Sequence, residues 1–166
     1  HFFYTGQPRG SEYAGAVCIQ ASEHWYAGYS VPLTDTGQDR KLFAYRGKIE
    51  EVVKVEAMGV VYLLIAYRTK DTASLQIYNC NSQQSVVFKS NHGQYSPREY
   101  IRVKDQLFLP CITPKSVELY NFDGKQVCSI PADSAVSVGM TQENGPVLVI
   151  GYNSAIQLIR LTLSPQ

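Results

Sequence analysis

The stretch Ser74-Leu-Gln-Ile-Tyr-Asn-Cys-Asn-Ser-Gln-Gln-Ser-Val-Val-Phe-Lys89 decides the fold. Its first six residues have apolar side chains at the second and fourth places, and its last five, Ser85-Val-Val-Phe-Lys89, contain three consecutive apolar residues after a polar turn. The same layout returns in the stretch from Ser116 to Ile130. There the turn contains Asp123-Gly124, a strong hairpin signal, because both residues tolerate a positive φ. Each stretch therefore predicts two antiparallel strands joined by a tight turn.

Four segments of the chain align without gaps. Each has apolar residues at its second and fourth places and an aromatic residue or Ile at its fifth; they are residues 41–46, 74–79, 116–121 and 155–160. A more continuous apolar run precedes each segment, which is typical of a strand buried on both faces. The segments follow one another at intervals of about 40 residues, the length of a four-stranded unit. We therefore predict that they are equivalent strands of four successive sheets, with Leu75, Ile77, Val117, Leu119, Ile156 and Leu158 buried.

Three segments carry a resemblance to WD40 repeats. Residues 75–84 (LQIYNCNSQQ) and 117–126 (VELYNFDGKQ) resemble the third strand and following turn of such repeats, and residues 146–161 resemble their second and third strands. Tyr-Asn stands where the Trp-Asp dipeptide of the family would be, and no Gly-His pair opens a unit. The resemblance implies an all-β, β-propeller-like array of about four four-stranded antiparallel blades over residues 1–166. This array is either a single propeller or a segment of a larger ring.

The spacing is irregular between Arg46 and Val60, where only 13 residues intervene and there is room for one strand instead of two. We expect residues 47–57 to form one long strand, because Val-Val-Lys-Val is rich in β-branched side chains. A short helix is the alternative, since Ile49, Val52, Val53 and Glu56 also fall near helical spacing.

The last aligned strand, within Ala155–Leu163, has no outer strand after it. Phe2–Thr5 could supply that strand and close a ring. Alternatively, the open edges near these two segments could accept a strand from a partner protein. A single β-sandwich or barrel, in which the repeat is due to chance, is the alternative to the array.

The charge balance excludes several classes of partner. Fifteen basic and 14 acidic residues leave a net charge of +1. Direct contact with nucleic acid is not expected, because phosphate binding depends on accumulated Lys and Arg.

The longest apolar run, Val60–Tyr67, is far shorter than the roughly 18 residues of a membrane-spanning helix. The first ten residues also lack the layout of a signal peptide. We therefore expect no membrane partner.

The four cysteines, Cys18, Cys80, Cys111 and Cys128, contain no C-x-x-C pair. Each lies in or at the end of an apolar run, where a free thiol behaves as a small buried hydrophobic group. We expect four unpaired thiols, with Cys111 and Cys128 in the interior, and an intracellular location in the cytoplasm or nucleus. The alternative is two disulfides in a secreted propeller enzyme or carbohydrate-binding module.

Catalytic and cofactor motifs are missing from the sequence. His1, His24 and His92 share no metal-ligand spacing, and the acidic residues fall singly at turn-like positions. No nucleophile elbow, phosphate-binding loop or dinucleotide fingerprint occurs. We therefore predict a protein that is not an enzyme and that needs no cofactor or metal.

The loops of such an array suggest where partners bind. In a propeller, loops from second to third strands share one face with loops that lead to the next blade. We assign to this face residues 32–40, 68–74, 90–98, 113–116 and 131–134. Its candidate partner-binding residues are Arg68, Lys70, Tyr95, Arg98 and Lys115, because Arg and Tyr are favoured interface anchors. We expect a non-catalytic protein-interaction scaffold, a WD40-like subunit of a multi-protein assembly that binds other proteins or peptides. An ordinary solvated rim is the alternative.

Overall fold

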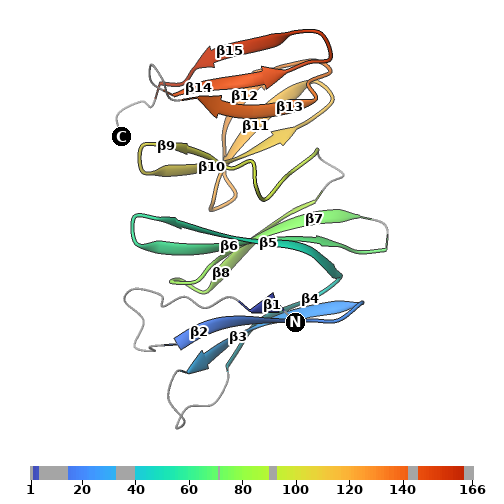
Figure 1. Ribbon diagram of the computed structural model, residues 1–166, viewed down its shortest axis with the longest axis vertical. Helices are drawn as coiled ribbons and strands as arrows, with labels where there is room; N and C mark the ends of the chain where they lie inside the picture. Colours follow the sequence, from blue (N-terminus) through green and yellow to red (C-terminus); the bar gives the residue numbers. More distant parts are fainter. Residues whose placement is uncertain are drawn as a thin grey trace. The chain divides into compact units, whose positions relative to one another are not determined.

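The computed structural model describes residues 2–3, 15–32, 40–70, 72–89, 93–141 and 146–162. These residues form strands and turns with no helix among them, and the strands group into four antiparallel sheets (Figure 1). The all-β class is therefore confirmed. The chain divides into two compact units, unit 1 (His1–Ser90) and unit 2 (Asn91–Gln166), with two sheets each. The described residues include no helix that is long and apolar enough to cross a membrane.

Unit 1 contains sheets A and B, each with its strands in chain order. Sheet A consists of β1 (Phe2–Phe3), β2 (Gly15–Ala21), β3 (Trp25–Pro32) and β4 (Arg40–Arg46). Sheet B consists of β5 (Lys48–Ala57), β6 (Val60–Arg68), β7 (Ala73–Asn79) and β8 (Gln84–Lys89). The ten residues of β5 confirm the single long strand that we predicted between Arg46 and Val60.

Unit 2 contains sheets C and D. Sheet C consists of β9 (Ile101–Val103), β10 (Gln106–Ile112), β11 (Ser116–Asn121) and β12 (Gln126–Pro131). Sheet D consists of β13 (Ser137–Thr141), β14 (Val147–Gly151) and β15 (Ile156–Arg160), and has no fourth strand within the described residues. The predicted hairpin between β11 and β12 is confirmed, with Gly124 at a φ of +86°.

The predicted equivalence of the four aligned segments is right for three of them. Residues 74–79, 116–121 and 155–160 lie in β7, β11 and β15, which are the third strands of their sheets. Residues 41–46 lie in β4, which is the fourth strand of sheet A. The prediction is wrong for this segment because β5 is the first strand of sheet B, so β4 has to complete sheet A.

The turns between second and third strands show which strands of the four sheets correspond to one another. In each sheet, a backbone N–H at the start of this turn donates to the carbonyl three residues on. The four bonds are Ser22 to Trp25 (2.8 Å), Thr69 to Thr72 (2.9 Å), Thr113 to Ser116 (2.9 Å) and Tyr152 to Ala155 (2.8 Å). The strand of sheet A that is equivalent to β7 is therefore β3.

The first strand does not complete sheet D. Phe2 and Phe3 form β1 and pair with Ile19 and Cys18 of β2, so they belong to sheet A. This corrects the suggestion that Phe2–Thr5 supplies the missing strand after β15; residues 4 and 5 lie outside the described part of the chain.

The predicted burial is right except in β15. Leu75, Ile77, Val117 and Leu119 are at most 4% exposed, as expected. Ile156 and Leu158 are 69% and 62% exposed, contrary to the prediction. Strand side chains alternate between faces, and in β15 the neighbouring Ile159 is the residue that packs on the core. No described residue covers the other face, so Ile156 and Leu158 remain in contact with solvent.

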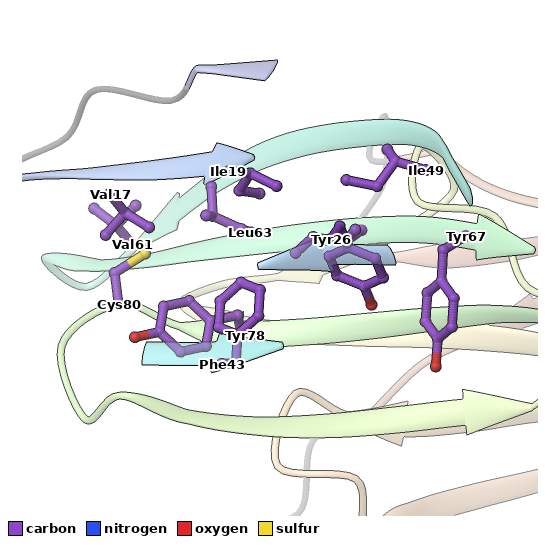
Figure 2. Close-up of a cluster of buried hydrophobic side chains, with 11 residues drawn as sticks. Val17, Ile19, Tyr26, Phe43, Ile49, Val61, Leu63, Tyr67, Tyr78 and Cys80 are labelled. Atoms are coloured by element: carbon purple, nitrogen blue, oxygen red, sulfur yellow. The ribbon is translucent and has the colours of Figure 1, made fainter. Parts of the chain in front are cut away.

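The core of unit 1 joins sheets A and B through apolar and aromatic side chains (Figure 2). Phe43 of sheet A lies 4.6 Å from Tyr78 of sheet B between ring centroids, and Tyr26 lies 5.1 Å from Tyr67. At the centre, the buried Tyr26 hydroxyl donates a 2.7 Å hydrogen bond to Oε1 of Gln76, which is fully buried. This bond satisfies the amide oxygen of Gln76, which would otherwise be costly to bury.

We predict that Tyr26→Phe lowers the free energy of unfolding by about 1–3 kcal/mol, because Oε1 of Gln76 loses its donor inside the core. Tyr152→Phe is the matched control: its hydroxyl makes a 2.7 Å bond to Oε1 of Gln157, but at an exposed site. We expect this control to cost no more than about 0.5 kcal/mol. Urea unfolding followed by circular dichroism measures both values, and equal losses would contradict the assigned role of burial.

Candidate functional site

An open hollow of about 900 Å³ lies at one end of unit 1, where three connections meet. The β2–β3 turn contributes Glu23 and His24, the β4–β5 connection contributes Arg46–Ile49, and the β6–β7 turn contributes Arg68–Lys70. Glu50 completes the lining. Both sheets of the unit therefore supply side chains to one hollow.

A single glycine makes this convergence possible. Gly47 is the only residue between β4 and β5, and its N–H donates a 2.8 Å bond to the His24 carbonyl in the β2–β3 turn. Its φ is +146°, a conformation that L-residues with side chains rarely adopt. A Cβ at this position would lie 2.7 Å from Cδ2 of Tyr67. Glycine therefore lets the chain cross from sheet A to sheet B directly against an aromatic ring.

The hollow carries an excess of positive charge. Its lining has four basic side chains, Arg46, Lys48, Arg68 and Lys70, against the two carboxylates of Glu23 and Glu50. Nε of Arg68 donates a 2.7 Å bond to Oε1 of Glu50, and both side chains are exposed. No described carboxylate pairs with the other three basic side chains. The hollow can therefore attract an anionic group, a carboxylate or a phosphate.

Trp25, the single tryptophan of the chain, lies beside this site. It is 40% exposed and is directly opposite Arg46 in the β3–β4 ladder. Exposed tryptophan and arginine side chains are frequent anchors at protein interfaces. This pair therefore adds apolar contact area next to the charged hollow.

The other three predicted binding residues lie in unit 2. Arg98 is exposed in the turn after Pro97, and Lys115 is exposed in the β10–β11 turn. Tyr95 is half-buried, with its ring centroid 6.5 Å from that of Tyr120. Burial, together with its hydrogen bond to Cys111, raises the pKa of the Tyr95 phenol. Tyr95 thus has a packing role in sheet C that the sequence did not indicate.

Of the five predicted residues, the hollow brings together Arg68 and Lys70. Sequence reasoning missed His24, Arg46 and Lys48. The signal for Arg46 and Lys48 was the Arg46-Gly47-Lys48 tripeptide, in which a glycine between two strands separates two basic residues. The alignment treats residues 41–46 as a third strand, and for that reason the sequence does not show that Gly47 connects two sheets.

The same misassignment placed residues 32–40 on the binding face. β3 ends at Pro32 and β4 begins at Arg40, and these strand ends lie at the opposite end of sheet A from the β2–β3 turn. Residues 33–39 lie outside the described part of the chain. In sheet A, the turn that lies on the same side as the β6–β7 turn is the β2–β3 turn.

The cysteines and the possible metal ligands of the described residues were the other candidates for a chemical role. The thiols of Cys80, Cys111 and Cys128 are free; Cys111 is buried as predicted, and Cys128 is half-buried. Burial raises the pKa of Cys80 to about 12 and that of Cys111 to about 11. The Cys18 side chain lies outside the described part. Within the described residues, no three His, Cys, Asp or Glu side chains are grouped as metal ligands.

We predict that Gly47→Ala lowers the free energy of unfolding by about 1–3 kcal/mol, since it combines backbone strain with a steric clash against Tyr67. Gly139→Ala in β13 is the control, because a Cβ there meets no atom within 4 Å. Thermal and urea unfolding compare the two variants. A Gly47→Ala variant as stable as the control would show that the connection has another conformation.

We also predict that iodoacetamide labels Cys80 and Cys111 slowly in the native chain at pH 8 and quickly in urea. Burial keeps both thiols protonated, and each unit by which burial raises the pKa lowers the thiolate fraction about tenfold. Mass spectrometry without reductant should find four labelled thiols. Native labelling as fast as in urea, or a disulfide, would contradict this prediction.

The same raised pKa values predict how stability depends on pH. Because the thiols of the unfolded state lose their protons near pH 9 and those of the folded state do not, the free energy of unfolding should fall as the pH rises from about 9 toward 12.

No protein-family model and no curated protein matches this chain. A solved structure with some similarity is that of a protein of unknown function from Bacteroides caccae, at 13% sequence identity and a TM-score of 0.35. The alignment covers 90% of this chain and 61% of that one, so this chain spans less than two thirds of the length of its structural neighbour.

Proposed function

We propose that this chain is a non-catalytic protein-interaction module of the WD40-like β-propeller kind, which binds other proteins or peptides through the turns at the ends of its sheets. Four antiparallel sheets with their strands in chain order are compatible with an array of blades. The observation that carries the functional part is the basic hollow in unit 1, where turns from two sheets converge.

The hollow has the physical properties of a peptide-binding site. Its side chains project from turns between paired strands, so the backbone that carries them needs little ordering when a partner binds. The excess of Arg and Lys favours a partner segment with Asp or Glu side chains, through charge-assisted hydrogen bonds. Exposed Trp25 beside Arg46 can cover apolar atoms of the same segment. The preferred ligand is therefore an acidic peptide segment that includes a bulky side chain.

The proposal extends to the cellular setting. The module acts as a subunit of a multi-protein assembly in the cytoplasm or nucleus. Buried thiols such as those of Cys80 and Cys111 remain reduced in that setting.

The test is affinity capture from the native source with the double variant Arg68→Glu/Lys70→Glu. Proteins bound through the hollow should be lost, because each anchor removed from an interface centre costs at least about 2 kcal/mol. The matched control is Lys41→Glu/Lys125→Glu, which makes the same change in net charge at exposed sites outside the hollow. Captured partners that are retained by the control and lost by the variant support the proposal.

A purified probe sharpens this test. Binding of a fluorescein-labelled peptide of alternating Glu and Trp should weaken at least tenfold in the double variant and should fall with added salt. The variant Arg98→Glu/Lys115→Glu measures what the turns of unit 2 contribute. Unchanged capture and unchanged peptide affinity in a folded Arg68→Glu/Lys70→Glu variant would exclude the hollow as the binding site.

A further inference from the structure

Among the described residues, sheet D has three strands where the other three sheets have four, and β15 is the edge strand of that sheet. Its side chains Ile156 and Leu158 lie on the outer face of the sheet and are 69% and 62% exposed. They lie opposite Gly151 and Val149 of β14. Exposed edge strands are usually protected by charges, proline or a bulge. This one carries a single charged residue, Arg160, and presents an apolar surface instead.

The backbone of this edge is available for pairing. Tyr152 N–H donates to the Ala155 carbonyl, and Leu161 N–H donates to the Pro146 carbonyl, so odd-numbered residues of this strand direct their backbone groups toward β14. In an antiparallel ladder, the alternate residues direct theirs to the other side. The N–H and C=O groups of Ile156, Leu158 and Arg160 therefore lie on the free edge, and no described segment pairs with them.

The complete sheets show what a fourth strand looks like in this protein. In sheet B, Leu75 and Ile77 of β7 lie opposite Phe88 and Val86 of β8. In sheet C, the equivalent residues of β11 lie opposite two residues of β12: Val117 is paired with Ile130 and Leu119 with Cys128. In both sheets, the third strand and the fourth strand each have a pair of apolar side chains two residues apart. The two pairs lie opposite each other on the same face of the sheet. By alignment, Ile156 and Leu158 are the corresponding pair in β15.

We infer that the free edge of β15 binds an extended protein segment as an antiparallel fourth strand of sheet D, with apolar side chains two residues apart beside Ile156 and Leu158. Main-chain hydrogen bonds to Ile156, Leu158 and Arg160 supply the pairing, and the alternate side chains supply the selectivity. The partner is an unstructured or extended segment with the pattern of β8. It is not the acidic segment proposed for the hollow of unit 1.

The test uses the chain itself and a labelled peptide with the sequence of Gln84–Lys89, Gln-Ser-Val-Val-Phe-Lys. Fluorescence anisotropy should show saturable binding. A control peptide, Gln-Ser-Thr-Val-Thr-Lys, lacks the two apolar side chains and should bind at least tenfold more weakly. Ile156→Thr/Leu158→Thr should also weaken binding at least tenfold, because both side chains are exposed and their loss leaves the fold intact. Val127→Thr, an exposed aliphatic residue of edge strand β12, is the matched control and should change affinity less than twofold.

Hydrogen exchange distinguishes strand addition from loose hydrophobic contact. Saturating peptide should slow exchange at the amides of Ile156, Leu158 and Arg160 at least tenfold, while Gln157 and Ile159, already bonded to β14, should change little. Arg68→Glu/Lys70→Glu should bind this peptide normally, which separates this site from the hollow. Absence of saturable binding, or binding without amide protection, overturns the inference. Self-association that Ile156→Thr/Leu158→Thr abolishes also overturns it, because a second copy of the chain would then occupy the edge.

Discussion

The constraint on which the structure depends is the two-residue period of a strand whose two faces are both apolar. In β6, Leu63 and Ile65 pack into the core of unit 1 while Leu64 points to the other face, and all three are fully buried. A sheet of this kind leaves a large apolar area in water unless each face is covered. Pairs of sheets in each unit meet part of this requirement: A with B in unit 1, and C with D in unit 2.

Close packing of two sheets also places the few polar and glycine residues of the core. Gln76 is the only polar residue among the buried ones described; its Oε1 accepts from the hydroxyl of Tyr26 in the facing sheet, while its Nε2 has no partner among the described residues. Gly47 is needed because the chain crosses between the sheets in one residue against the ring of Tyr67. The same short crossing brings Arg46 and Lys48 to the turns of both sheets. The candidate site is thus a consequence of how the two sheets are connected.

Sheet D shows what happens where the constraint is not met. Its inner face packs on sheet C through Leu148 and Ile150, whereas its outer face keeps Ile156 and Leu158 in water. Within the described part of the unit, β15 therefore presents both an apolar surface and a row of backbone groups without a strand partner. The basic hollow and this edge have opposite physical character, which suits two different kinds of partner segment. Binding as proposed at the hollow would depend on charge, and binding as proposed at the edge would depend on backbone pairing and apolar contact.

From the sequence alone followed the all-β class, the single long strand β5, the strands β7, β11 and β15, and the hairpin at Asp123-Gly124. These features are local, because alternation of side chains and turn chemistry act within a few residues. The sequence also indicated Arg68 and Lys70 as binding candidates, and the structure places both in the lining of the hollow. Only the tertiary structure decided which sheet β4 completes, which face of β15 is covered, and that Arg46 and Lys48 join Arg68. The reason is that strand partners and covered faces depend on residues far apart in the chain, and a one-residue change of register reverses which side chains are buried.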